Sequence, residues 1–439
     1  MDEEGRRASF LTTLNPDMNL RRVVVTGLGT VNPIGNNIEE YFRNLEQGVG
    51  GAATITLFDA SKFKTQFACE VKGFDPNQHF DRKEARKYDR FTQFALVAAK
   101  EAVQDAGLVD GENNTFDSVD KDRVGVVWAS GIGGIGTFFD EVVYFAKGDG
   151  TPKYNPFFIP KMIADIAAGH ISMKYGFRGP NYCTVSACSS SNHAFIDALN
   201  LIRWGKADVI VSGGSEAAIN PAGIGGFNAM QALSTRNDDP ATASRPYDTG
   251  RDGFVMGEGA GALVLEEYEH AKARGAKIYA EVIGGGMSAD AYHLTAPDPE
   301  GAGAVLAMRE ALKDAGITAD QIDYINTHGT STPAGDLPEM KGIATVLGDH
   351  VYEVNISSTK SMTGHLLGGA AAIEALACIM AIDRGIVPPT INVTERDPQI
   401  DPKINLTLGK AQRREVNCAL SNTFGFGGHN STVIFRKVK

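Results

Sequence analysis

The chain has 439 residues, of which 43% are hydrophobic and 22% charged, a composition typical of a globular protein with one large or two ordinary domains. Its formal net charge of −11 argues against nucleic-acid binding as the main role. No apolar run is long enough to predict a membrane span, and the charged first residues lack the apolar core of a signal peptide.

Five cysteines are scattered along the chain, and no two of them form a Cys-x-x-Cys pair. We therefore expect neither a disulfide framework nor a structural zinc site, and the reducing cytoplasm is the compartment that fits. Residues 1–17 differ in character from the rest of the chain, so we interpret them as a tag or a disordered extension before a native start at Met18.

Strand and helix patterns alternate from residue 23 onward. Buried strands are predicted at 23–26, 123–128, 209–212, 260–266, 278–283, 324–327 and 431–435. Helices are predicted at 91–106, 194–204, 303–315 and 370–384. This alternation predicts an α/β fold with parallel or mixed sheets.

A coarse internal repeat divides the chain. Each half opens with a strand that runs into a glycine, Gly27 or Gly284, and later carries a helix that ends in Asp-Ala-Gly, at 105–107 and at 314–316. Two matches in the same order predict a duplicated α/β unit. A site between the halves would draw residues from both.

Cys188 is the most informative single residue. It follows an extended, β-branched approach and precedes a run of small residues and the predicted helix 194–204. This order predicts a thiol on a tight turn at a helix N-terminus, where free N–H groups and the helix dipole stabilise a thiolate nucleophile. The alternative is a buried structural cysteine.

Two histidines lie in polar, glycine-containing loops. His328 directly follows a predicted strand, and His365 lies five residues after Lys360. Histidine in such loops can act as a general acid or base or donate hydrogen bonds to developing charge. The alternatives are a surface-loop histidine and a solvated lysine.

A fourth loop, 421–430, combines two phenylalanines with glycines whose backbone N–H groups could turn toward a ligand. By itself this pattern is more typical of a tight β-turn. Residues 131–136 fit Gly-x-Gly-x-x-Gly, but no strand ending in an acidic residue follows at the distance a dinucleotide site needs. Cysteine, two histidines and lysine together fit acyl transfer through a thioester on Cys188.

These motifs together resemble the β-ketoacyl-acyl carrier protein synthases of the condensing-enzyme (thiolase-like) family, and among them the bacterial type II elongating enzymes. The resemblance covers residues 20–439 and rests on the Cys188 turn and on the segments 245–248, 257–261, 290–297, 326–336, 360–365 and 424–430. It implies an α/β thiolase-like fold of two duplicated halves in a layered α-β-α-β-α core. The half 18–272 would carry the nucleophile, and the half 273–439 the histidines.

The resemblance also implies the chemistry, which is fatty-acid elongation. Cys188 would take an acyl chain from its carrier protein as a thioester. His328 and His365 would bind the malonyl thioester carbonyl and promote loss of carbon dioxide, and the enolate would attack acyl-Cys188 to lengthen the chain by two carbons. Backbone N–H groups of Cys188 and Phe426 would form the oxyanion hole, and Phe426 would gate the site.

Further roles and partners are implied by the same resemblance. Lys360, with Glu339 as its acidic partner, would hold the charge and geometry of the site. Substrate contacts would come from Thr295, Thr330 and Thr332 on the phosphopantetheine arm, from Ile132 and Phe227 along the acyl chain, and from Phe424. The acidic acyl carrier protein would dock on a basic patch of Lys83, Arg86 and Lys87. A homodimer is implied, with no cofactor and no metal.

The chain departs from the family pattern at three places. Ser189-Ser190-Ser191-Asn192 follows the cysteine where the family commonly has Ala/Thr-Ser/Thr-Gly, His429 replaces a threonine, and Gln231 replaces an arginine that often helps to dock the carrier protein. Other functions left open are a polyketide-type ketosynthase, a type I elongating synthase and a chain-length-factor-like partner, which typically lacks the cysteine. A nicotinamide oxidoreductase is the alternative outside the family.

Overall fold

The computed structural model describes residues 20–111 and 114–438, so the predicted extension at 1–17 lies outside the described residues. The strands of its main sheet are β1 (Val23–Val31), β4 (Val124–Ala129), β5 (Asn181–Thr184), β6 (Val209–Glu216), β7 (Gly259–Glu267), β8 (Ala280–Ala289), β9 (Tyr324–Asn326), β10 (Asn355–Ser357), β13 (Cys418–Gly425) and β14 (His429–Arg436). Two small sheets pair β2 (Ala53–Thr54) with β3 (Phe67–Ala68) and β11 (Ile386–Val387) with β12 (Gln412–Arg413).

The helices are α2 (Ile38–Gln47), α3 (Arg82–Ala85), α4 (Arg90–Asp105), α5 (Ile135–Lys147), α6 (Phe158–Met162), α7 (Ile166–Tyr175), α8 (Ser190–Arg203), α9 (Pro221–Ala229), α10 (Tyr268–Ala273), α11 (Ala302–Ala315), α12 (Asp336–Leu347), α13 (Lys360–Thr363) and α14 (Ala370–Arg384). None of the helices in the described part of the chain has the length and apolar character needed to cross a bilayer.

The main sheet has ten strands in the order β10-β9-β13-β14-β8-β1-β7-β6-β4-β5. From its centre outward, the strands of the first half, β1-β7-β6-β4-β5, correspond one by one to those of the second half, β8-β14-β13-β9-β10. The pairing directions match as well. β6 is antiparallel to β7 and parallel to β4, as β13 is antiparallel to β14 and parallel to β9. The halves join where β1 and β8 pair antiparallel at Val24–Glu281 and Val25–Ala280. This symmetry confirms the duplicated α/β unit predicted from the sequence.

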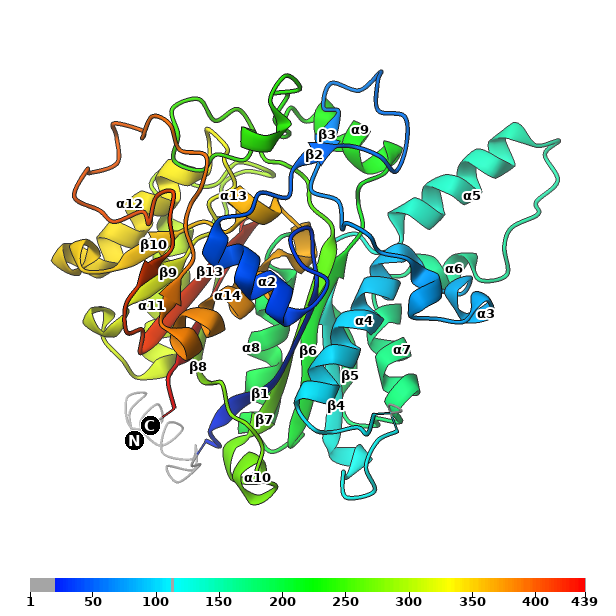
Figure 1. Cartoon of the computed structure of the whole chain (residues 1–439), viewed down its shortest axis with the longest axis horizontal. Helices are drawn as coiled ribbons and strands as arrows, with labels where there is room; N and C mark the ends of the chain where they lie inside the picture. The colour runs from blue at the N-terminus through cyan, green and yellow to red at the C-terminus, as the bar shows by residue number, and fades with distance from the viewer. Residues whose placement is uncertain (1–19, 112–113, 439) are drawn as a thin grey trace, which may run out of the picture.

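Helices cover the sheet in layers (Figure 1). On one outer side α4 packs on β1, β6 and β7, and α7 packs on β4; on the other, α11 packs on β8 and β14. Between them α8 and α14 contact each other and strands of both halves. The result is the predicted α-β-α-β-α arrangement. α14 is apolar on almost every side, which is the pattern of a helix buried all round.

The repeated sequence phrase has a physical explanation. Asp105 accepts a hydrogen bond from the N–H of Leu28 at 2.9 Å, and Asp314 accepts one from the N–H of Gly285 at 2.9 Å. In each half, the aspartate that ends the helix therefore holds the opening strand just after its first glycine. The strand glycines let the backbones approach closely, as Gly286 shows against α11.

Equivalent turns of the two halves carry the predicted catalytic groups. Cys188 lies between β5 and α8, and His365 lies between β10 and α14. His328 follows β9, the counterpart of β4, which leads into the glycine run at 131–136. The duplicated fold thus gathers both halves' turns around one point.

The sequence patterns missed several elements. α5, α7 and β13 were not predicted, β5 was predicted only as an extended approach to Cys188, and α8 begins at Ser190 rather than at Ala194. The serine run therefore forms the first turn of α8. Its small polar residues lack the apolar periodicity that marked the rest of that helix.

We predict that Gly286→Ala lowers the free energy of unfolding by about 1–3 kcal/mol or more, because a Cβ there would meet the Ala307 carbonyl oxygen at 2.0 Å. Gly169→Ala in α7 is the matched control, since no atom beyond its chain neighbours and the nearby backbone of its own helix lies within 4 Å of its Cβ position, and it should leave stability equal or higher by about 0.5–1 kcal/mol. Urea unfolding of both variants measures the difference; equal effects would contradict the close packing of β8 on α11.

Candidate active site

A cavity of about 390 Å³ lies where the two halves meet. Cys188, His328 and His365 line it together, as the sequence predicted for a site between the halves. Other predicted residues also line it: Thr295, Thr330, Thr332, Glu339, Phe227, Phe424 and Phe426. Ile132 is not part of this lining, and its side chain is 37% exposed. Gln231, which stands where the resemblance implies an arginine, lies in the wall.

The Cys188 turn is compact and strained. Ala187 has a positive φ of 51°, a conformation that non-glycine residues adopt at a cost and that is concentrated at functional sites. α8 starts two residues after the cysteine, with Ser189 at its N-cap position. The predicted location of the thiol at a helix N-terminus is therefore correct.

Burial, however, controls the ionisation of this thiol. It raises the pKa of Cys188 to about 12, although Lys360 and a hydrogen bond from the Phe426 N–H act to lower the pKa. Burial therefore opposes the thiolate that we expected the helix N-terminus to stabilise. The thiol is protonated near neutral pH, so its proton must leave when the sulfur attacks.

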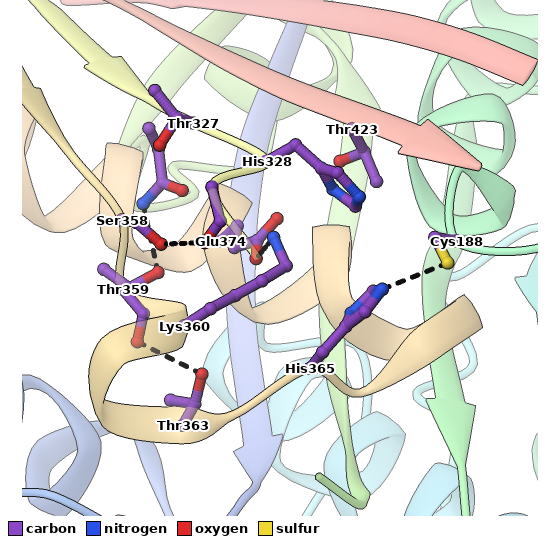
Figure 2. A network of polar contacts seen from close by, with 12 residues as sticks. Cys188, Thr327, His328, Ser358, Thr359, Lys360, Thr363, His365, Glu374 and Thr423 are labelled. Atoms are coloured by element: carbon purple, nitrogen blue, oxygen red, sulfur yellow. Dashed lines mark hydrogen bonds and ion pairs between the residues drawn. The ribbon is translucent and has the colours of Figure 1, made fainter. Parts of the chain in front are cut away.

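His365 is the proton acceptor within reach. Its Nε2 lies 3.0 Å from the Cys188 Sγ (Figure 2). Burial, together with the nearby Lys360, holds the pKa of His365 well below its usual value, so the ring is neutral and can accept a proton. The backbone of His365 is held against the Val255–Gly257 segment by two hydrogen bonds of 2.8 and 2.9 Å.

His328 lines the same cavity and lies close to His365 (Figure 2). Its ring centroid is 5.2 Å from that of His365, and the two rings are nearly perpendicular. Burial, Lys360 and His365 all hold the pKa of His328 well below its usual value. Two neutral imidazoles therefore face one small volume, and both can donate an N–H to an oxygen that gains negative charge.

Lys360 pairs with Glu374 rather than with Glu339. The lysine Nζ contacts Glu374 Oε1, and both side chains are 1% exposed (Figure 2). This corrects the predicted acidic partner. The sequence signal was present but unused: Glu374 is an acidic residue within the otherwise apolar, fully buried first part of α14.

Glu339 holds the His328 loop instead. Its two carboxylate oxygens accept hydrogen bonds from the N–H groups of His328 and Gly329, both at 2.8 Å. Burial raises the pKa of Glu339 to about 7, although both N–H donors favour the ionised form. Glu339 thus lines the cavity and also holds the backbone of the histidine loop.

The loop that carries Phe424 and Phe426 lines the cavity. Phe424 stacks edge-on against His328 at 5.7 Å, and Phe426 lies 6.3 Å from Phe227. Gly425 between them leaves no room for a side chain, because a Cβ there would meet the Ser186 carbonyl oxygen at 2.8 Å and the Cys188 nitrogen at 3.1 Å. The hairpin therefore packs directly against the Cys188 turn.

Glu216, at the end of β6, was not identified from the sequence. Its buried carboxylate accepts hydrogen bonds from the N–H groups of Gly131, Ile132 and Gly368 and from the hydroxyl of Ser130. The Gly-x-Gly-x-x-Gly segment is therefore bound to a carboxylate of its own chain, which explains that motif without a nucleotide. An isolated glutamate after a buried strand carries no distinctive pattern.

Lys83, Arg86 and Lys87 lie apart from the cavity lining, exposed on and just after α3. Asp81 caps this short helix through the N–H groups of Lys83 and Glu84. Across the described residues, no group of three or more His, Cys, Asp or Glu side chains is arranged to hold a metal ion.

Comparison with known proteins identifies the architecture. The beta-ketoacyl synthase N-terminal domain model matches residues 20–271, and the C-terminal domain model matches residues 279–394. The chain is 50% identical over 417 residues to 3-oxoacyl-[acyl-carrier-protein] synthase 2 of Synechocystis sp., covering 95% of this chain and 98% of the relative. It is 47% identical to the enzyme of that name from Vibrio harveyi, covering 96% and 100%.

Solved structures agree with this result. A beta-ketoacyl synthase from Burkholderia phymatum superposes with a TM-score of 0.87 at 35% identity, covering 96% of this chain and 100% of that one. A type II polyketide ketosynthase, solved in complex with its acyl carrier protein, superposes with a TM-score of 0.86 at 34% identity and the same coverage.

Proposed function

The chain belongs to the β-ketoacyl synthase family, and from that premise we propose that it elongates acyl chains by decarboxylative condensation on Cys188. It is an acyltransferase that joins malonyl-acyl carrier protein to an acyl-Cys188 thioester and releases 3-oxoacyl-acyl carrier protein, in fatty-acid synthesis. The observation that carries this function is the 3.0 Å contact of Cys188 Sγ with neutral His365, beside neutral His328, in one cavity.

The first half-reaction loads the enzyme. The Cys188 sulfur attacks the carbonyl of an acyl thioester on the phosphopantetheine arm, and its proton passes to His365 Nε2 as the S–C bond forms. The N–H groups of Cys188 and Phe426 would stabilise the tetrahedral oxyanion. The carrier thiolate then leaves and takes the proton, which returns His365 to its neutral form.

The second half-reaction makes the carbon–carbon bond. The malonyl thioester carbonyl would accept hydrogen bonds from His328 and, once the single ring proton of neutral His365 is on Nε2, from His365, and carbon dioxide leaves with formation of an enolate. The enolate carbon attacks the acyl-Cys188 carbonyl, and the Cys188 thiolate is expelled and takes up a proton. Lys360 keeps both imidazoles neutral, because a buried cation beside them disfavours a second positive charge.

Predicted substrate-binding residues offer both hydroxyl groups and apolar surface inside the cavity. Thr330 and Thr332 place their hydroxyl oxygens 3.1 Å apart in the wall, and Thr295 lies in the same lining, so three hydroxyls are available to the amides of a phosphopantetheine arm. Phe227 and the gate of Phe424 and Phe426 offer apolar surface to the acyl chain.

We expect incubation of the protein with acyl-acyl carrier protein to add the mass of one acyl group, and Cys188→Ala to abolish this adduct. His328→Ala should keep Cys188 acylation but slow malonyl decarboxylation by at least about 100-fold, since one of two donors to the enolate oxygen is lost. Intact-mass spectrometry and carbon dioxide release measure the two steps. An acyl adduct on Cys188→Ala, or decarboxylation at the normal rate by His328→Ala, would contradict the assignment.

A polyketide-type ketosynthase is the second candidate, supported by the likeness to the polyketide enzyme solved with its carrier protein. A series of acyl donors separates the two functions. Preference for saturated chains supports fatty-acid elongation, whereas preference for poly-oxo chains supports polyketide synthesis.

Docking of the carrier protein on Lys83, Arg86 and Lys87 is supported by their exposure and by the acidic nature expected of the partner. We predict that Lys83→Glu/Lys87→Glu raises the KM for the carrier-bound donor about tenfold while leaving turnover of a protein-free acyl-pantetheine unchanged. Lys403→Glu/Lys410→Glu, an equal charge reversal elsewhere, should leave both unchanged. Equal effects of the two double variants would contradict a specific patch.

A homodimer is supported by the edge of the sheet. β5 is the last strand, and an exposed strand edge offers free N–H and C=O groups to another chain. Beside it Val185 is 61% exposed, and α5, which projects from the body in Figure 1, exposes Phe138 and Tyr144. An apolar surface of this kind is typical of an interface.

We predict a particle of twice the 46.8 kDa chain mass in sedimentation, and a shift toward monomer in Val185→Asp. Leu306→Asp, which places the same charge on an exposed leucine of α11, should leave the dimer intact. A monomeric wild type would contradict the proposal.

We place the boundary of the halves at 272/273, which falls at the end of α10, shortly before β8 opens the second half of the sheet. A cytoplasmic location is supported by the cysteines, all five of which are free thiols.

A further inference from the structure

The serine run after Cys188 is the departure from the family pattern that the proposed chemistry leaves unexplained. Ser189, Ser190 and Ser191 are all 0% exposed, and each hydroxyl is hydrogen-bonded. The Ser190 hydroxyl stays within the turn, where it accepts from the Ser186 N–H and donates to the Ala187 carbonyl. The hydroxyls of Ser189 and Ser191 instead bond to two different segments outside the turn.

Ser189 reaches the gate hairpin. Its hydroxyl lies within hydrogen-bond distance of the carbonyl oxygens of Thr423, at 2.9 Å, and His429, at 2.7 Å. These residues flank the loop that holds Phe426. Ser189 thus connects the cysteine turn to the predicted oxyanion donor.

Ser191 reaches the histidine loop. Its hydroxyl donates to the carbonyl oxygen of Gly368, three residues after His365. Glu216 accepts the N–H of the same Gly368 at 3.0 Å, so this residue is held from two sides. The fit is close, because a Cβ on Gly214 would lie 2.1 Å from the Ser191 Oγ.

The position of His365 depends on this backbone. Its Nδ1 is buried and has no hydrogen-bond partner among the described residues, so no side chain or carbonyl fixes the ring through that atom. The turn after it contains Leu367 with a positive φ of 48°, a strained conformation that the surroundings must maintain. Contacts that hold Gly368 therefore also hold the ring that faces the thiol.

We propose that Ser191 is a positioning residue that sets the separation of Cys188 Sγ and His365 Nε2 by holding the His365 loop to the first turn of α8. This inference rests on the proposed role of Cys188 as nucleophile. The proton must cross from sulfur to Nε2 as the sulfur attacks, and small displacements of reacting groups slow such steps strongly. Loss of the Ser191 hydroxyl should therefore slow thiol chemistry without requiring loss of the fold.

Iodoacetamide tests the proton transfer without carrier protein. The sulfur–carbon bond forms, iodide leaves, and the thiol proton passes to His365 and then to solvent. The rate at Cys188 is measured by peptide mass from pH 6.5 to 9.5. Ser191→Ala and Ser212→Ala are each made in two backgrounds, one with His365 intact and one that carries His365→Ala. Ser212 is the matched control, because its buried hydroxyl has no partner in the described structure.

Ser191→Ala should lower the alkylation rate about tenfold at neutral pH when His365 is present, and less than twofold in the His365→Ala background. Ser212→Ala should match the parent in both backgrounds. An unchanged rate in Ser191→Ala, an equal loss in both backgrounds, or a His365→Ala variant as reactive as wild type would each overturn the proposal.

Two further measurements keep the result decisive. Ser191→Gly introduces the glycine of the family pattern and provides a second variant without the hydroxyl should Ser191→Ala fold poorly. Its alkylation rate should also fall when His365 is present and change little in the His365→Ala background. Acylation of Cys188 by acyl-acyl carrier protein is scored separately by intact mass. Failure of acylation in wild type would contradict the proposed function, whereas normal acylation with no Ser191 effect would overturn this inference alone.

Discussion

Burial of the reacting groups is the constraint on which the site depends. In an enclosed cavity, a thiol keeps its proton and an imidazole stays neutral, because each charged form loses its hydration. Cys188, His328 and His365 all follow this rule. A resting site without charge on these groups suits the proposed chemistry, in which negative charge appears on oxygen only during the reaction.

The ion pair of Lys360 with Glu374, whose side chains are both 1% exposed, is held by α13 and α14. Removal of one partner would leave an isolated buried charge, whereas the pair together is tolerated. Lys360 acts through its charge. It lowers the pKa of both histidines, and it also lowers the pKa of the Cys188 thiol, against the effect of burial. Lys360 thus influences which of these groups carry protons, and it does not contact the sulfur.

The duplicated fold brings the reacting groups together. Cys188 and His365 occupy equivalent turns before the two central helices, α8 and α14, which pack on each other. Hydrogen bonds from the start of α8 then join these turns to the hairpin and to the histidine loop. The proposed nucleophile, base and oxyanion donor therefore come from separate segments that hydrogen bonds from the start of α8 join together.

Much of this protein was determined by local sequence. Strand and helix periodicity, the repeated Asp-Ala-Gly phrase and the residue types of the Cys188, His328 and His365 loops depend on near neighbours, and they predicted the α/β halves and the residues that meet in the cavity. Three features were decided only by the tertiary structure: the protonation of the buried thiol, the pairing of Lys360 with Glu374 instead of Glu339, and the destinations of the Ser189 and Ser191 hydroxyls. Each depends on which groups distant in sequence surround an atom after folding, because desolvation, ion pairing and hydrogen bonding act through space rather than along the chain.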